Sequence, residues 1–340
     1  MSDGARWDSS YHAPVLAAEV VRLLAGADAS PEADAAVERG EGAPGAGRLA
    51  VDGTLGGGGH ALALLEAGFR VIGLDRDPAA LADAGRRLAA HAARGAFTAH
   101  RANYADPASV AALDAVRPDA VLLDLGISSH QVDDLGRGFS FREGAPLDMR
   151  MGFDAPRDAA ALLAEADERE LARVFREYGD EPRGARLARE IVRRRASAPL
   201  TTSDDLVRAI RGALGPRTGP GDFARLFQAV RIAVNDELAG LERALPLWRD
   251  RLRPGGRLAV IAYHSGEDRL VKHAFRAWST GCSCPPRQPV CTCGGVPLGA
   301  LVTRRGVAAS EGETERNPRA RSARLRVWER ARDRDGARAA

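Results

Sequence analysis

The chain has 340 residues, of which 45% are hydrophobic, 5% aromatic and 28% charged. This length allows one substantial hydrophobic core together with a second, smaller domain. No apolar run approaches the roughly 18 residues of a membrane span, and the first residues lack the pattern of a secretory signal. The formal net charge of +3 excludes a strongly basic protein, so a nucleic-acid partner would need a local cationic surface.

Short apolar runs alternate with helical patterns in the first part of the chain. The runs with strand character are residues 49–55, 69–75, 97–102 and 119–126. Helical patterns follow the first three of them, at 60–68, 78–93 and 106–116. Strands separated by helices of this length predict right-handed crossovers and a parallel sheet. We therefore expect an α/β fold with a Rossmann-like core and a mostly parallel sheet.

This alternation stops near Gly136. Helical patterns without a clear strand follow at 160–179, 185–196 and 203–214, and a long helix with an apolar stripe then runs from Phe223 to Leu245. Strand character resumes at 256–264 and 325–331. The order predicts a discontinuous sheet domain, interrupted by an inserted helical domain. The expected boundaries are 1–136 and 222–330 for the sheet domain, 137–221 for the insert, 25–48 for a flexible insertion and 331–340 for a disordered tail.

The strongest local signal is the segment DGTLGGGGH at 52–60, between a predicted strand and a helix. Its glycines allow a sharp turn and a close approach to a ligand at a helix N-terminus. Asp75 ends the next strand, where an acid can bind ribose hydroxyls. Such a pair fits NAD as well as S-adenosylmethionine. Asp52 at the start of the loop favours S-adenosylmethionine, because a carboxylate attracts its cationic amino-acid end and repels a pyrophosphate.

A series of sequence blocks resembles the bacterial ribosomal RNA small-subunit methyltransferase H family. The blocks run in order at 12–20, 52–60, 73–78, 122–134, 137–151, 178–191, 227–238, 264–272 and 317–330. The resemblance implies a class I methyltransferase core with an inserted helical domain. It also implies methyl transfer from S-adenosylmethionine to N4 of a cytidine in 16S rRNA, with the small ribosomal subunit as partner in the cytoplasm. The cofactor contacts that it implies are Gly58, Gly59, His60, Asp75, Tyr104, Asp124 and Gln131.

Asp124 ends the fourth predicted strand and precedes a polar turn. Ligands of open parallel sheets bind outside the carboxyl ends of the strands. The exocyclic amine of cytosine is a poor nucleophile, and a carboxylate within hydrogen-bond reach can accept its proton. We therefore expect Asp124, or a backbone carbonyl of the turn 124–129, to be the proton acceptor, with Ser128 and His264 as further catalytic candidates. The structural alternatives are a cap or turn for Asp124 and, after His264, acids that favour a first helical turn.

Clusters of arginine with aromatic or small residues are typical of RNA-facing surfaces. The candidate RNA contacts are Arg137, Arg142, Arg150, Arg319, Arg321 and Arg324. By contrast, we expect the run from Arg193 to Arg195 to be a solvated helix face. RNA that presents its base to an enzyme must be single-stranded or have that base flipped out.

All four cysteines, Cys282, Cys284, Cys291 and Cys293, lie in one turn-rich segment. They can wrap one zinc ion, although pairs of the form C-x-C are tighter than the usual zinc knuckle. Four reduced thiols are the alternative, and both readings agree with a reducing compartment.

Two other function classes stay open on the sequence. One is an NAD-dependent oxidoreductase that uses the same glycine loop. The other is a non-catalytic RNA-binding or assembly protein with a vestigial cofactor pocket. For oligomeric state, a homodimer through the helical insert is one alternative.

Overall fold

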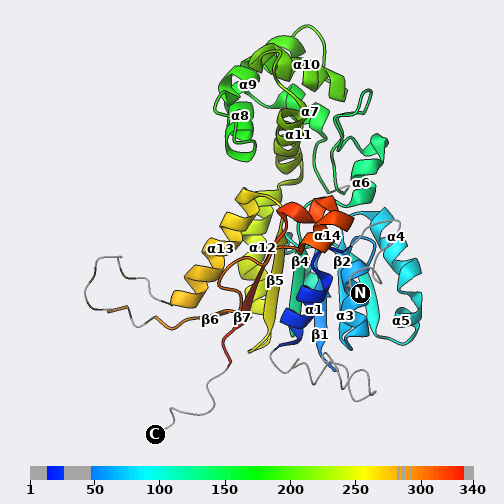
Figure 1. The fold of residues 1–340 in the computed structure, drawn as a ribbon, viewed down its shortest axis with the longest axis vertical. Coiled ribbons are helices and arrows are strands. Elements are labelled where there is room, and N and C mark those ends of the chain that lie inside the picture. The colour runs from blue at the N-terminus through cyan, green and yellow to red at the C-terminus, as the bar shows by residue number, and fades with distance from the viewer. Residues whose placement is uncertain are drawn as a thin grey trace. The chain divides into compact units, whose positions relative to one another are not determined.

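The computed structural model describes residues 14–26, 47–152, 154–281, 284, 288, 290, 292, 293 and 295–332. The chain divides into two compact units (Figure 1). Unit 1 combines residues up to Gly126 with residues from Gly240 onward, and unit 2 is Ile127–Ala239. The expected insert, 137–221, is therefore shorter than the compact unit. Most of the predicted insertion at 25–48 and of the predicted tail at 331–340 lies outside the described residues.

Unit 1 is built on one seven-stranded sheet in the order β3-β2-β1-β4-β5-β7-β6. The first five strands are parallel, β7 is antiparallel to β5, and β6 is antiparallel to β7. The mostly parallel sheet is therefore confirmed. Its strands are β1 (Leu49–Asp52), β2 (Arg70–Asp75), β3 (Phe97–Arg101), β4 (Ala120–Asp124), β5 (Arg257–Ala262), β6 (Gly299–Leu301) and β7 (Arg324–Arg330).

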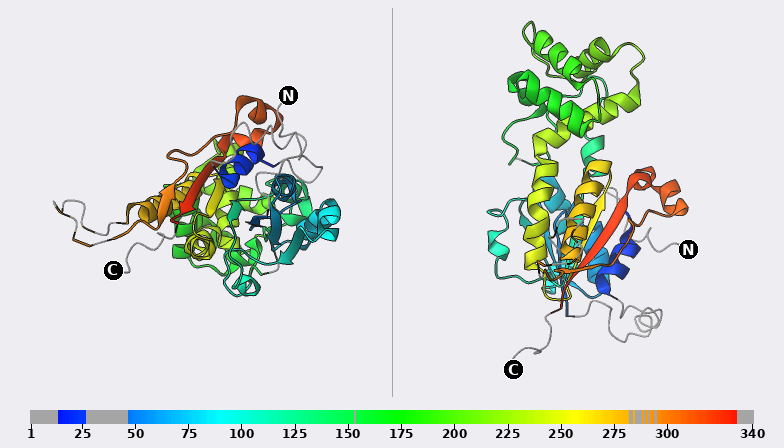
Figure 2. Two further views of the ribbon diagram at one scale, coloured as in Figure 1. Left: turned by 90° about the horizontal axis from the view of Figure 1, so that it is seen from below. Right: turned by 90° about the vertical axis from the view of Figure 1, so that its left-hand side faces the viewer.

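Helices cover both faces of this sheet (Figure 2). On one face, α1 and α3 bury aliphatic side chains against β1, β4 and β7. On the other, α12 and α13 contribute large side chains such as Trp248 and Phe275, which lie in the same cluster as Trp328 of β7. The helices of unit 1 are α1 (Ala17–Ala25), α3 (Gly59–Glu66), α4 (Pro78–Arg87), α5 (Ala89–Ala93), η2 (Ala111–Leu113), α12 (Glu237–Arg251, which starts just before the division), α13 (Ser265–Thr280), α14 (Glu311–Arg316) and η5 (Pro318–Ser322).

Unit 2 is helical, and its described residues include no strand beyond an isolated bridge between Pro146 and Thr202. Its core is an apolar cluster to which α7, α9, α10 and α11 all contribute. Because Phe223, Leu226 and Val230 of α11 belong to this cluster, α11 is part of unit 2 rather than of the sheet domain. The helices are α6 (Ser129–Asp133), η3 (Leu135–Arg137), α7 (Ala159–Glu165), α8 (Glu168–Arg173), the π-helical η4 (Val174–Tyr178), α9 (Gly184–Arg195), α10 (Ser203–Leu214) and α11 (Pro220–Asn235).

Three predicted helices are interrupted. The long helix of 223–245 breaks at Asp236, which adopts a left-handed conformation (φ 53°) that an aspartate tolerates better than most residues. The helix of 160–179 is divided into α7, α8 and η4, with Asp167 capping the start of α8. The stretch 106–116 forms only the short η2, because the Asp106 side chain accepts a hydrogen bond from the Ala108 amide and so favours a turn.

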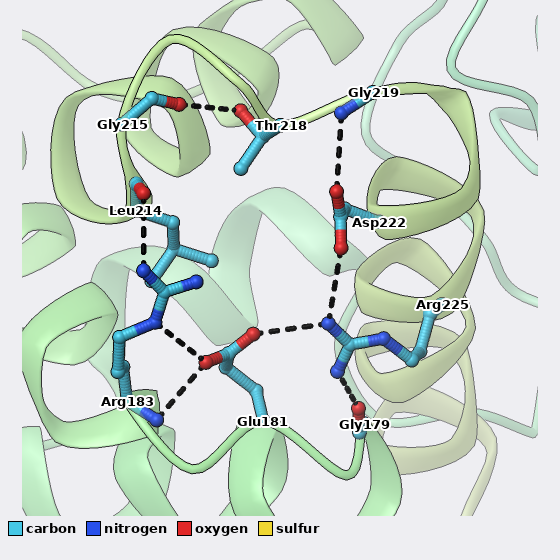
Figure 3. A network of polar contacts seen from close by, with 9 residues as sticks. All are labelled: Gly179, Glu181, Arg183, Leu214, Gly215, Thr218, Gly219, Asp222 and Arg225. Carbon is cyan, nitrogen blue, oxygen red and sulfur yellow. Dashed lines mark hydrogen bonds and ion pairs between the residues drawn. The ribbon is translucent and has the colours of Figure 1, made fainter.

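An ion-pair network around the buried Glu181 joins three segments of unit 2, namely 179–183, the end of α10 and α11 (Figure 3). The Glu181 side chain is 3% exposed and pairs with Arg183 at 3.2 Å and with Arg225 at 2.9 Å. Arg183 also donates to the carbonyl of Leu214 at the end of α10, and Arg225 to the carbonyl of Gly179. Burial raises the pKa of Glu181, but the hydrogen bonds and charges of the two arginines outweigh burial and hold the pKa below its ordinary value.

Candidate functional site

Three aspartates lie at the carboxyl edge of the parallel sheet, at the ends of β1, β2 and β4. Asp52 pairs in register with Leu122 on β4, and Asp124 pairs with Ile261 on β5, so the ends of adjacent strands are aligned. The topology reverses between β1 and β4, because the chain runs outward from β1 to β3 before returning to β4. This switch point is where open α/β sheets bind ligands.

The glycine loop holds this edge together through its own backbone amides. The amide of Gly56 donates to Asp75 Oδ2 at 2.8 Å, and the amide of Thr54 donates to Asp52 Oδ1 at 3.1 Å. Gly58 has φ 76°, a left-handed conformation that favours glycine, and a Cβ atom there would lie 3.0 Å from Leu88, which directly follows α4. The sequence expectation of a sharp turn before α3 is therefore confirmed.

Asp52 is the most buried acid of the site, with 0% of its surface exposed. Its Oδ2 atom has no hydrogen-bond partner among the described residues. The pKa of Asp52 is raised to about 6, and burial is the largest cause. His60 and the Thr54 amide oppose this rise, whereas the charges of Asp124 and Asp75 add to it. No arginine or lysine that the structure describes forms an ion pair with this carboxylate.

Asp75 and Asp124 are perturbed in the same direction. Burial raises the pKa of Asp75 to about 6, against the opposing hydrogen bonds from the amides of Asp77 and Gly56. Burial also raises the pKa of Asp124 to about 7, against a hydrogen bond from Tyr263. Three carboxylates with raised pKa values at one sheet edge form a candidate functional site.

Both oxygen atoms of Asp124 lie next to ring side chains. Tyr263, directly after β5, donates its hydroxyl to Asp124 Oδ1 at 2.9 Å. His60 Nδ1 lies 3.6 Å from Asp124 Oδ2, which is longer than a hydrogen bond. His60 Nε2 lies 2.9 Å from the carbonyl of Val15, and burial lowers the pKa of His60, so the ring is neutral with its proton assigned to Nε2.

The donor set fits S-adenosylmethionine. The ammonium and sulfonium groups of that cofactor are positively charged, so they would lower the raised pKa values of these carboxylates. The ammonium can also donate a hydrogen bond to Asp52 Oδ2, which has no partner among the described residues. Asp75 accepts one amide hydrogen bond on each oxygen and retains lone pairs for ribose hydroxyls. A pyrophosphate would instead meet three carboxylates of its own charge.

His264 and the acids after it mainly organise the start of α13. Glu267 is 2% exposed, and its Oε2 accepts hydrogen bonds from the amides of Tyr263 at 2.8 Å and of His264 at 3.4 Å. The ring of His264 lies 3.1 Å from Glu267 Oε1. Asp268 makes a two-pronged ion pair with Arg326 of β7. Glu267 and Asp268 therefore have the structural role that the sequence offered as the alternative, while the catalytic role of His264 stays a prediction.

The remaining cofactor candidates lie in both units. Tyr104 of unit 1 follows β3, and its backbone carbonyl accepts a hydrogen bond from Trp248 at 3.0 Å. A Cβ atom on Gly53 would lie 3.3 Å from Tyr104 Cβ, so the tyrosine borders the glycine loop. Gln131 and Ser128 belong to unit 2, where each amide donates to the other's side chain and caps α6.

The predicted RNA-contacting arginines are likewise divided between the two units. Arg324 pairs in register with Ala262, which places it beside the carboxyl end of β5, and Arg319 and Arg321 are exposed in the preceding turn η5. In unit 2, Arg137 donates to the carbonyls of residues 150 and 151, and Arg150 pairs with Asp148. Arg142 is exposed. Arg137 and Arg150 therefore support the local fold, and their RNA contacts stay predictions.

The zinc hypothesis falls partly outside the structure, because Cys282 and Cys291 are not among the described residues. In the part of the chain that is described, no group of three or more His, Cys, Asp or Glu side chains is arranged to hold a metal ion. Cys284 is half-buried and Cys293 is exposed.

Sequence reasoning missed two residues of the site. Tyr263 was hidden in an apolar strand pattern, although its place at the end of the strand beside β4 was a signal. Thr54 was treated as part of the glycine loop, but its Oγ1 accepts a hydrogen bond from the Asp124 amide at 2.6 Å and so links the loop to β4.

Comparison with known proteins confirms the resemblance to a methyltransferase family. Residues 9–331 match the MraW methylase family. A protein of Gemmatimonas aurantiaca named ribosomal RNA small subunit methyltransferase H is 58% identical over 94% of this chain and 95% of its own length. Proteins of the same name from Heliobacterium modesticaldum and Myxococcus xanthus are 48% and 50% identical, over 83% and 85% of this chain and 92% and 93% of their own lengths. The chain therefore belongs to the MraW methylase family.

Proposed function

We propose that this protein transfers a methyl group from S-adenosylmethionine to the exocyclic N4 of a cytidine in the 16S rRNA of the small ribosomal subunit. The observation that carries the proposal is the set of buried, under-compensated carboxylates at the switch point of a sheet in a methylase-family chain. The names of the relatives supply the rRNA substrate.

The cofactor would be held by the glycine loop, with Asp52 toward its ammonium group and Asp75 toward its ribose. When bound, S-adenosylmethionine supplies an electrophilic methyl group on a positively charged sulfur. Gly58, Gly59 and His60 shape the turn that leads into α3, and Tyr104 offers an aromatic ring beside this loop.

Asp124 would act on the cytosine amine. Its Oδ1 is occupied by the Tyr263 hydroxyl, which leaves Oδ2 to accept a hydrogen bond from the amine N–H and then its proton. The positive charge of the bound cofactor favours the ionised carboxylate, which can then take up the proton as N4 loses it.

Two tests separate this function from its alternatives. Mapping of N4-methylcytidine in 16S rRNA from cells with and without the gene should show one modified cytidine that disappears with the gene. In the second test, S-adenosylhomocysteine should raise the melting temperature of the protein, whereas NAD should leave it unchanged. Unchanged rRNA modification would contradict the proposal and favour a non-catalytic RNA-binding protein. Membership in a methylase family argues against the oxidoreductase alternative.

Three finer points belong to the same proposal. We expect the protein to work in the cytoplasm, where its rRNA substrate is made. No helix of the described residues is both long and apolar enough to cross a membrane. Zinc at the four cysteines is tested by metal analysis of protein purified without chelator, and the homodimer by its mass in solution.

A further inference from the structure

Helix α13 starts directly after His264, at the same sheet edge as the candidate active site. It buries Val271, Phe275 and Trp278 in the core of unit 1. Its opposite side carries cationic residues at helical spacing, and we call this side the α13 basic face. It consists of Arg269, Lys272 and Arg276, of which the two arginines are exposed and the lysine is half-buried.

The α13 basic face has no acidic residue of its own to neutralise it. Glu267 is buried and caps the helix, and Asp268 is occupied by Arg326 at 2.7 and 2.9 Å. None of the three cations has an ion pair or hydrogen bond to another residue that the structure describes. Their positive charge therefore faces solvent uncompensated.

Exposed cations without a described partner also occur elsewhere, as at Arg169 of α8 and Arg186 of α9, but several arginines of other helices are neutralised. The exposed Arg86, Arg193 and Arg208 each pair with an acid three residues earlier in their own helix. The basic run of α9 is also neutralised, because Arg194 pairs with Glu190 and Arg195 donates to two backbone carbonyls.

The positive surface continues toward the active-site edge. Arg304 and Arg305 are exposed in the loop before Gly306, where a Cβ atom would lie 3.5 Å from Arg324 Cβ and 3.6 Å from Arg326 Nη2. Arg326 in turn binds Asp268 on α13. Arg324 pairs in register with the last residue of β5. The loop therefore links the end of β5 to the first turns of α13.

We propose that the α13 basic face binds backbone phosphates of the RNA that flanks the target cytidine. This inference rests on the proposed function, which makes RNA the substrate. Charge complementarity favours a polyanion, since arginine forks and a lysine ammonium bind phosphate oxygens without reading a base. From Arg269 to Arg276 the helix rises roughly 10 Å, so the face can contact a stretch of backbone rather than a single group.

Salt dependence of RNA binding tests this surface. The variant R269Q/K272Q/R276Q removes the face, and R86Q/R193Q/R208Q is the matched control, because it removes three arginines that are already paired. Loss of three phosphate contacts should make the plot of log affinity against log salt shallower by about 2 for single-stranded RNA. The control should keep the slope of the wild-type protein, and both variants should bind S-adenosylhomocysteine normally.

Lys272 gives an independent test, because it is the only lysine among the 340 residues. An acetylating reagent modifies this single lysine side chain, which mass spectrometry distinguishes from the N-terminal amine. Saturating 16S rRNA fragment should slow acetylation of Lys272 severalfold. Equal acetylation rates with and without bound RNA, or an unchanged salt slope for the triple variant, would overturn the inference.

The outcomes separate this inference from the proposed function. If the wild-type protein binds RNA but makes no N4-methylcytidine, the function fails while the salt slopes still decide the role of the face. If the wild-type protein methylates rRNA but the triple variant keeps the wild-type salt slope, the proposed function holds and the α13 basic face does not bind phosphates. Normal methylation of free rRNA by the triple variant, with loss on assembled subunits, would indicate an acidic protein partner and contradict phosphate binding. Absence of RNA binding by the wild-type protein would overturn both.

Discussion

The acids inside the two units differ in whether arginines neutralise their negative charge. In unit 2, Glu181 lies between two arginines, and its pKa stays below the ordinary value. In unit 1, Asp52 is buried and Asp75 and Asp124 are half-buried, and none of the three forms an ion pair with an arginine that the structure describes. Their pKa values rise to about 6, 6 and 7. A satisfied buried charge stabilises the fold, whereas an unsatisfied one is a cost that a cationic ligand or a proton relieves. The comparison therefore separates a structural network from a binding site.

The largest expected effect comes from Asp124→Asn. The amide can still accept the Tyr263 hydroxyl, but it cannot take the amine proton, so we expect the methylation rate to fall about 10²- to 10⁴-fold. Single-turnover methylation of undermethylated small subunits measures this loss, and titration with S-adenosylhomocysteine provides the control for cofactor binding. Near-normal turnover with normal cofactor affinity would remove Asp124 from the chemistry.

Asp52→Asn should weaken S-adenosylmethionine binding by about ten- to a hundredfold, because a charged hydrogen-bond acceptor is lost. It should also stabilise the cofactor-free protein at pH 7 by about 1–3 kcal/mol. The sign follows from a folded-state pKa above the unfolded value, which makes the ionised carboxylate unfavourable as pH rises from about 4 to about 6. Calorimetry and chemical denaturation measure the two changes. A destabilised variant would mean that Asp52 already has a counter-charge.

Glu181→Gln should act in the opposite way. It leaves Arg225 and Arg183 without their shared carboxylate and should destabilise unit 2 by about 1–3 kcal/mol, with cofactor affinity unchanged. Hydrogen exchange of amides in α9 and α11 reports this region separately. The matched control is Glu177→Gln, whose 57% exposed side chain pairs only on the surface and should contribute less than about 1 kcal/mol. Equal destabilisation by the two variants would mean that the Glu181 network contributes no more to stability than a surface ion pair.

The smallest effect is expected from Tyr263→Phe. The Tyr263 hydroxyl lowers the pKa of Asp124 against the effect of burial, so its loss should raise that pKa by about one unit. If the ionised carboxylate is required, the acid limb of the pH–rate profile moves to higher pH by the same amount. The rate then recovers in alkaline solution. A uniform loss at every pH would indicate a structural role for the tyrosine.

The sequence predicted the sheet better than it predicted the helices. Apolar runs bounded by turn residues placed β1, β2, β4 and β5 correctly, since strands buried on both faces are almost continuously apolar. The edge strand β3, exposed at four of its five residues, and the antiparallel β7 were also placed correctly. The three-residue β6 was too short to give a signal. Helix lengths were overestimated wherever an aspartate interrupted an apolar stripe, as at Asp167 and Asp236, because periodicity does not report side-chain capping or a left-handed residue.

Local chemistry in the sequence determined the glycine loop, the acids at the strand ends and membership in a methylase family. Only the tertiary structure decided which charges are compensated. From the sequence, Arg137 and Arg150 were candidates for RNA contacts, but Arg137 binds backbone carbonyls and Arg150 binds an aspartate of unit 2. The cations of the α13 basic face, by contrast, form no ion pair with an acid that the structure describes. The reason is physical: a residue's type fixes its charge, but burial and the partners brought close by folding fix the energy of that charge.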